Sequence, residues 1–232
     1  MPDAIHAYRL GGIASLLGVV VLFVATLLHP MDMPPWDAPA AFAEYAADGH
    51  WVCSHLGQLL GVLLGVTGLL TLAWRLREGR AGAWALIGAG LAIASLALAF
   101  ALQAVDGVAL KLMVDRWQVA DAATRPLVFE AAYGVRQIEV GLASLMGIAF
   151  ALTVLVYGVA LWLSARTPTW LGLFGLLAGA ALLVASLVQA HTGFSELAMN
   201  LSMPASLLLM IWQVAAGVHL LRAREDGVGR VA

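Results

Sequence analysis

The chain alternates long apolar stretches with shorter polar segments. Six stretches contain no Asp, Glu, Lys or Arg, at 10–28, 56–74, 82–105, 140–163, 170–190 and 201–221. A helix needs roughly 20 mostly apolar residues to cross a bilayer. Because each stretch is close to or above that length, the pattern predicts six transmembrane helices.

Composition supports this interpretation. Hydrophobic residues make up 62% of the chain and charged residues 11%, and the mean hydropathy is +0.92. Soluble domains are about 25% charged. We therefore expect an all-α integral membrane protein in which residues 1–232 form a single polytopic domain.

Basic residues are concentrated on one set of span ends. Eight of the twelve lie on the termini and on the short loops after the second and fourth spans, and the other four lie within the long segment 106–138. Short cytoplasmic segments carry an excess of Lys and Arg. We therefore expect a multi-pass protein of the plasma (inner) membrane with both termini in the cytoplasm and outer loops at 29–55 and 106–138.

The predicted outer side holds ten of the fourteen acidic residues. An acidic surface argues against nucleic acid as a partner, so the predicted partner is the lipid bilayer. Within the outer loops, an Ala-rich run at 38–47 predicts a short helix. The segment 107–138 predicts a helical hairpin that extends beyond the bilayer and can dock a membrane-protein partner.

Two pairs of spans are similar in sequence. The run 103–107, Gln-Ala-x-x-Gly, recurs at 189–193, and His55 at the start of the second span corresponds to Glu139 at the start of the fourth. This similarity predicts a tandem hairpin repeat of spans two–three and four–five. Such parallel repeats are related by an axis along the membrane normal. We expect the four spans to form a four-helix bundle with the first and sixth spans alongside.

The second span also carries three glycines at intervals of four, Gly57, Gly61 and Gly65. Small residues at this spacing allow close backbone approach between helices in lipid. The stripe predicts a closely packed face of this helix and indicates no particular chemistry.

Five groups that can bind a proton or a metal ion lie at the predicted outer ends of the spans. They are His29, His55, Asp106, Glu139 and His191. Polar groups that border hydrocarbon are costly and are therefore functional-site candidates. Side chains on facing helices build cofactor sites in bundles, so we expect these groups to converge at the outer mouth.

Each of the five also has a structural explanation. His55 can form a hydrogen bond to a neighbouring helix. Glu139 follows Arg136 by three residues, so the two can pair on one helix face. The other three can be helix-end residues solvated at the membrane interface.

The histidines suggest a cofactor. His29, His55 and His191 are candidate ligands for haem b, and all five groups are candidate ligands for a transition metal. Imidazole is the commonest metal ligand. Met31 and Met33 follow His29, and thioether sulfur with imidazole suits copper. Zinc is the third candidate cofactor.

Three functions remain open at this point, and the sequence does not decide whether the protein is an enzyme. The first is redox or electron transfer at a haem or metal site on the exoplasmic side. The second is a non-enzymatic role as an accessory subunit or small transporter. The third is a zinc-dependent intramembrane lipid hydrolase, in which three histidines and a carboxylate would leave an open position for water.

Overall fold

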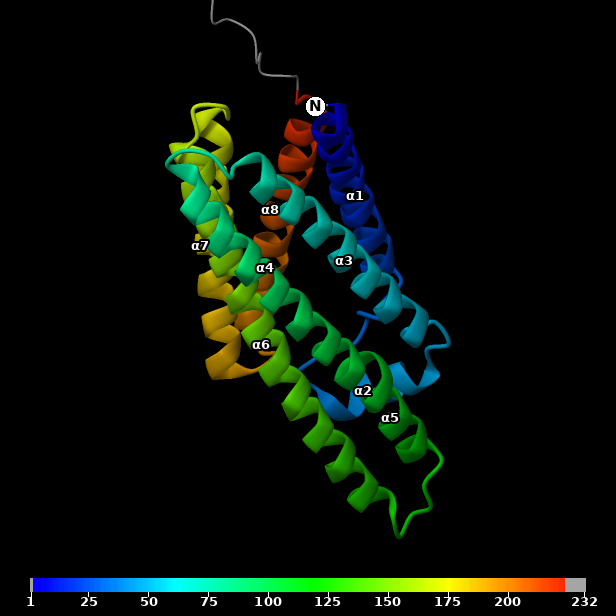
Figure 1. Cartoon of the computed structure of the whole chain (residues 1–232). Helices are drawn as coiled ribbons and strands as arrows, with labels where there is room; N and C mark the ends of the chain where they lie inside the picture. Colours follow the sequence, from blue (N-terminus) through cyan, green and yellow to red (C-terminus); the bar gives the residue numbers. More distant parts are fainter. Residues whose placement is uncertain (1, 224–232) are drawn as a thin grey trace, which may run out of the picture.

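The structure, a computed structural model, describes residues 2–223, which fold into helices joined by short loops (Figure 1). The predicted cytoplasmic residues Arg224 and Arg230 lie outside the described residues. In chain order the helices are α1 (Pro2–Leu27), α2 (Ala38–Ala47), α3 (Trp51–Arg75), α4 (Ala81–Gln103), the π-helix η1 (Ala104–Leu110), α5 (Lys111–Gln118), α6 (Arg125–Leu163), α7 (Thr169–Thr192) and α8 (Glu196–Leu221).

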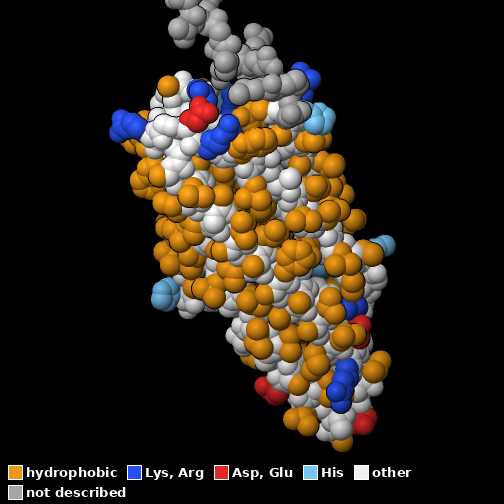
Figure 2. Space-filling model, viewed as in Figure 1, with side chains coloured by type: hydrophobic (Ala, Val, Ile, Leu, Met, Phe, Trp, Pro, Cys, Tyr) orange, Lys and Arg blue, Asp and Glu red, His pale blue; other side chains and the backbone are white. Residues whose placement is uncertain are grey.

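The predicted six-span, all-α fold class is confirmed. Among residues 2–223, six helical segments are long and apolar enough to cross a membrane: α1, α3, the continuous unit of α4, η1 and α5, and then α6, α7 and α8. Hydrophobic side chains cover the middle of the face shown in Figure 2, and charged side chains gather toward its two ends. The protein is therefore a multi-pass membrane protein.

The six membrane helices form a closed ring. Each packs against two neighbours in the order α1, α3, α4, α6, α7 and α8, and α8 returns to α1. Leu72, Tyr157 and Trp212 are fully buried in the core between them. The predicted repeat is not confirmed, because α1 and α8 are members of the ring and lie between α7 and α3.

Several helices, among them α3 and α6, begin well before the apolar stretches that predicted them. His55 is the fifth residue of α3, whereas Glu139 is the fifteenth residue of α6. The two residues therefore do not occupy equivalent helix starts. At 1.5 Å per residue, the 39 residues of α6 span about 58 Å, roughly twice the hydrocarbon thickness of a bilayer.

The excess length of α6 supports a small second core. Residues 125–138 of α6, together with α2 and α5, form what we call the cap, which lies at the lower end of the ring in Figure 1. Phe42, Trp51 and Trp117 are buried in its core. The Nζ atom of Lys111 donates to the backbone carbonyls of Tyr45 and Ala46 in the last turn of α2, where carbonyls lack their full set of partners within the helix. We call the opposite end, where both termini lie, the terminal end.

Candidate functional site

The centre of the candidate site is the buried side chain of His55. Its ring is 1% exposed and is held between two oxygen atoms. Nδ1 lies 2.7 Å from the backbone carbonyl of Trp51, one helical turn earlier, and Nε2 lies 3.1 Å from Oδ2 of Asp106. A carbonyl only accepts hydrogen bonds, so Nδ1 carries a proton and Nε2 faces the carboxyl group.

The contact between His55 and Asp106 is a close polar contact in a largely buried setting. Nε2 and Oδ2 lie 3.1 Å apart, and the two side chains are 1% and 15% exposed. Nε2 is not aligned as a hydrogen-bond donor to Oδ2. The pair is an ionisable contact between α3 and η1 at the cap end of the ring.

Asp106 reaches His55 because its helix is π-wound at this point. Residues 104–110 form η1, and such insertions in α-helices are frequent at functional sites. The next residue, Gly107, lies directly against α3: a Cβ atom there would be 2.6 Å from Cβ of His55. Trp51 fixes the same segment, since its Nε1 donates to the backbone carbonyl of Asp106 over 3.1 Å.

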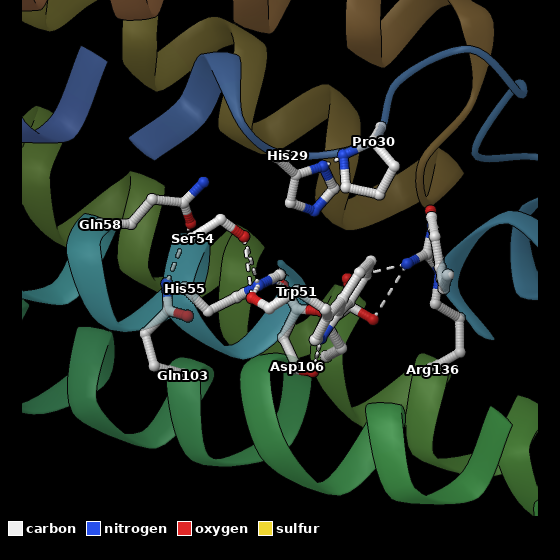
Figure 3. Close-up of polar contacts among 11 residues, drawn as sticks. His29, Pro30, Trp51, Ser54, His55, Gln58, Gln103, Asp106 and Arg136 are labelled. Carbon is white, nitrogen blue, oxygen red and sulfur yellow. Dashed lines mark hydrogen bonds and ion pairs between the residues drawn. The ribbon is translucent and has the colours of Figure 1, made fainter. Parts of the chain in front are cut away.

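His29 follows the end of α1 and lies beside this pair. Its ring centroid is 5.0 Å from that of His55 and 4.9 Å from the nearer ring of Trp51. Nδ1 donates to the carbonyl of Pro30 over 2.8 Å. Burial, and then the nearby His55, lower the pKa of His29, so the ring favours its neutral form. Figure 3 shows His29, Trp51, His55 and Asp106 together.

Glu139 belongs to a second buried pair beside the first. As the sequence predicted, it pairs with Arg136, whose Nη1 lies 3.0 and 3.1 Å from the two carboxylate oxygens. Nη2 of Arg136 donates to the hydroxyl of Tyr45 over 3.2 Å. Burial raises the pKa of Tyr45, so this hydroxyl stays protonated near neutral pH. The Tyr45 ring lies 4.4 Å from Trp51 and joins the two pairs.

Four of the five predicted groups thus gather at the cap end, and His191 does not join them. His191 is exposed in the last turn of α7, and no hydrogen bond, ion pair or ring contact in residues 2–223 links it to the other four. The reason is the ring topology, which inserts α8 and α1 between α7 and α3.

The arrangement does not support the predicted haem, copper or zinc site. Within the described residues, no group of three or more His, Cys, Asp or Glu side chains is placed to hold one metal ion. Both ring nitrogens of His55 already face oxygen atoms, whereas a zinc ligand needs its nitrogen about 2 Å from the metal.

Sequence reasoning missed the groups that position the site. Trp51 and Tyr45 count as hydrophobic residues and were not predicted as site residues, although Trp51 lies one helical turn before His55. The contact between Gln58 and Gln103 was also missed: Nε2 of Gln103 donates to Oε1 of Gln58 over 3.4 Å. Two glutamines in separate apolar spans were the available signal, because polar side chains in lipid pair across helices.

Inside the ring, next to this polar cluster, lies a cavity of about 670 Å³. Residues of α1, α3, α6, α7 and α8 line it, and no residue of α4 does. Most of the lining is apolar, with glutamine amides at three places, Gln58, Gln189 and Gln213. No charged side chain from the described part of the chain lines the cavity.

Gln58 lies at the boundary between the cavity and the buried histidine. It lines the cavity and lies about one helical turn after His55 on α3. In Figure 3 its amide nitrogen points away from Gln103, on the side opposite the bond between the two glutamines. Oε1 of Gln103 and Oδ1 of Asp106 are buried acceptors that receive no hydrogen bond in the described residues.

Comparison of the chain with protein-family models, with curated proteins and with solved structures returned no match.

Proposed function

We propose that this protein binds a small lipid-soluble molecule inside its ring of helices and acts as a small transporter or carrier. The single observation that carries the proposal is the cavity of about 670 Å³. Protein interiors are close-packed, with few voids larger than a water molecule. Ligand pockets are commonly 300–1,000 Å³, largely apolar, and carry a few polar groups.

The position of the cavity supports a ligand taken from the bilayer. Its lining belongs mainly to the membrane-crossing helices and is mostly apolar, so an aqueous solute would lose its hydration there without replacement hydrogen bonds. A lipid-soluble molecule has no such penalty along its apolar part. Gln58, Gln189 and Gln213 can then recognise its polar atoms.

The polar cluster at the cap end supplies the chemistry of the proposed function. Ionisable groups within membrane segments are costly and usually functional. His55 and Asp106 are in contact over 3.1 Å but do not line the cavity, whereas Gln58 lines it and is bonded to Gln103. Gln58 can therefore meet the polar end of a bound molecule, with the ionisable pair behind it.

A cavity-filling variant tests the proposal directly. Gly65 lines the cavity, and a Cβ atom there would meet only Nε2 of Gln213, at 3.9 Å. Gly65→Leu therefore places a side chain in the ligand space without a backbone clash. The matched control is Gly90→Leu on α4, where a Cβ atom would meet nothing within 4 Å and the cavity is not reached.

Each protein is purified in a mild detergent, extracted with organic solvent and analysed by mass spectrometry. We expect wild type and Gly90→Leu to retain a lipid-soluble compound in stoichiometric amount, and Gly65→Leu to lose it. Ser206→Phe, which also enters the cavity, serves as a second filling variant if Gly65→Leu does not fold. Equal retention by all folded variants, or no retention by wild type, would overturn the proposal.

A redox function with haem b or copper is the second candidate. One observation favours it: the rings of His29 and His55 lie 5.0 Å apart, so two imidazoles are close together. A UV–visible spectrum and elemental analysis of the purified protein decide this point. A haem absorption band or one metal ion per chain, abolished by His55→Ala, would favour the redox function over the carrier.

The zinc hydrolase and the accessory subunit stay predictions, as does docking of a partner on the hairpin 107–138. A hydrolytic zinc site requires three protein ligands and an open position. Lipid turnover that depends on added zinc and is abolished by Glu139→Gln would favour the hydrolase. Co-purification of a stable partner with the unaltered protein, lost on changing exposed residues of the hairpin, would favour the subunit.

A further inference from the structure

The exposed part of the cavity lining defines its opening. Six lining residues are exposed, and all six lie on α1, on the segment just after it, or on α8: Phe23, Leu27, Met31, Met203, Pro204 and Leu207. The lining residues of α3, α6 and α7 are buried or only partly exposed. The cavity therefore opens sideways, between the cap-end halves of α1 and α8.

The two helices pack closely from the middle of α1 toward the terminal end. Ser15 donates to the carbonyl of Gln213 over 3.1 Å and accepts from the Gln213 amide over 2.8 Å. A Cβ atom at Gly12 would be 2.8 Å from the carbonyl of Gly217. In Figure 1, the N-terminal part of α1 and the C-terminal part of α8 lie close together at the terminal end, and the two helices separate toward the cap. The contacts close the terminal half and leave the cap half open to the bilayer.

The sequence of α8 favours this opening. Pro204 lies inside the helix at the mouth of the cavity. It has no N–H to donate to the carbonyl four residues earlier, and its ring clashes with that carbonyl, so a proline in a helix interior bends the helix. Pro204 therefore interrupts the backbone hydrogen bonding of α8 beside the opening.

We propose that the gap between α1 and α8 is a lateral portal, and that its ligand is an uncharged amphiphile carrying a carbonyl or hydroxyl group. The molecule enters from the bilayer leaflet on the cap side, and its oxygen lies near Gln58. This inference rests on the proposed carrier function, and it names the substrate class and the route of entry.

The charge of the lining selects the ligand class. A phosphate or carboxylate buried in the cavity would lack a cationic partner among its lining residues, and an unpaired buried charge is strongly disfavoured. A neutral oxygen needs only one donor, and the amide nitrogen of Gln58 supplies it. Isoprenoid quinones and monoacyl glycerols share this chemistry, so both are tested.

The first arm of the experiment identifies the ligand class. Wild-type protein is titrated in detergent with decylubiquinone, with monoolein or with dioleoylphosphatidylglycerol, and binding is followed by native mass spectrometry. We expect one molecule of a neutral probe to bind per chain, and its identity distinguishes a quinone from a monoacyl lipid. Tighter binding of the anionic phospholipid would overturn the ligand class.

The variant Gln58→Leu tests the position of the ligand oxygen. We expect it to bind the neutral probe more weakly than wild type does, and equal binding would contradict the placement of the ligand oxygen near Gln58.

The second arm tests the portal. Phe23→Trp with Leu207→Trp adds bulk on both sides of the mouth, and exchange of bound probe for an isotopically labelled copy is timed. We expect exchange to slow about tenfold, because added bulk at the mouth raises the barrier for both entry and release. The control is Leu177→Trp with Val184→Trp, which are exposed on α7 outside the cavity.

The two proposals fail in different ways. Exchange at the wild-type rate in the double portal variant would overturn the lateral portal and leave the carrier function standing. Absence of binding for all three probes, together with an empty wild-type cavity on extraction, would overturn the carrier function itself.

Discussion

Nε2 of His55 and Oδ2 of Asp106 lie 3.1 Å apart, with the two side chains 1% and 15% exposed. The other ring nitrogen of His55 faces the carbonyl of Trp51. The carboxyl group of Asp106 is therefore the group that faces Nε2 of His55. This relationship links α3 to η1 at the depth where the cavity ends and the cap begins.

The first prediction concerns this contact. Asp106→Ala removes the partner of a buried nitrogen, and we expect a loss of about 1–3 kcal/mol in the free energy of unfolding. Asp106→Asn should cost less, because the amide can donate to Nε2 of His55. Chemical unfolding in detergent measures both, with Asp32→Ala at an exposed site as the control. Equal losses for the Ala and Asn variants would contradict the assigned contact.

The second prediction concerns the pair formed by Arg136 and Glu139, which are 6% and 3% exposed. Glu139→Gln leaves a buried guanidinium without its counter-charge, and removal of one member of such a pair costs about 3–5 kcal/mol. The double variant Arg136→Met with Glu139→Leu leaves no buried charge unpaired and should be markedly more stable than Glu139→Gln.

Thermal unfolding followed by circular dichroism tests this order. Glu130→Gln, an exposed change on the same helix, should leave the midpoint at the wild-type value. If the double variant were as unstable as Glu139→Gln, the pair would stabilise the fold by more than the neutralisation of its two charges.

The spans were predictable because the cost of placing charge in hydrocarbon is a local property of the sequence. The glycines show where this logic ends. Gly57 and Gly61 pack as predicted, since Cβ atoms there would be 2.9 and 2.7 Å from atoms of α1. Gly65 continues the same stripe but borders the cavity. Sequence spacing does not distinguish a glycine that packs from one that leaves space.

The predicted convergence was partly wrong for a reason of topology. His29, His55 and Asp106 gather because α1 and η1 both contact α3. The sequence pattern placed His191 at the same outer end of the spans as the other groups. However, the neighbours of α7 in the ring are α6 and α8, and not α3. The order of helices around a ring depends on contacts between distant segments, which hydropathy alone does not encode.

The third prediction is a pH dependence that arises from His29. Burial and His55 lower its pKa below the ordinary value of 6.5, and Arg136 also lowers it, whereas Asp106 raises it. The unfolded chain then binds a proton at this residue at a higher pH than the folded chain does. Stability therefore falls as the pH drops below 6.5 and is constant, for this group, above it.

The unfolding midpoint measured from pH 8 to pH 5 checks this sign. His29→Gln should flatten the acidic decline, whereas His50→Gln, at an exposed position, should leave it unchanged. An acidic decline of the same steepness in His29→Gln would assign it to another group.

The fourth prediction uses Gly107 to separate the two sides of the site. A Cβ atom at this position would lie 2.6 Å from Cβ and 3.1 Å from Cγ of His55, so Gly107→Ala forces η1 away from α3. Because His55 is fully buried, it has little room to move. We expect Gly107→Ala to lower the unfolding midpoint and to weaken retention of the bound compound.

The control is Gly134→Ala on α6, where a Cβ atom meets nothing within 4 Å. Within a helix, this change should stabilise the protein by about 0.5–1 kcal/mol. If Gly107→Ala also stabilised the protein, the close approach of η1 to His55 would not be part of the folded state.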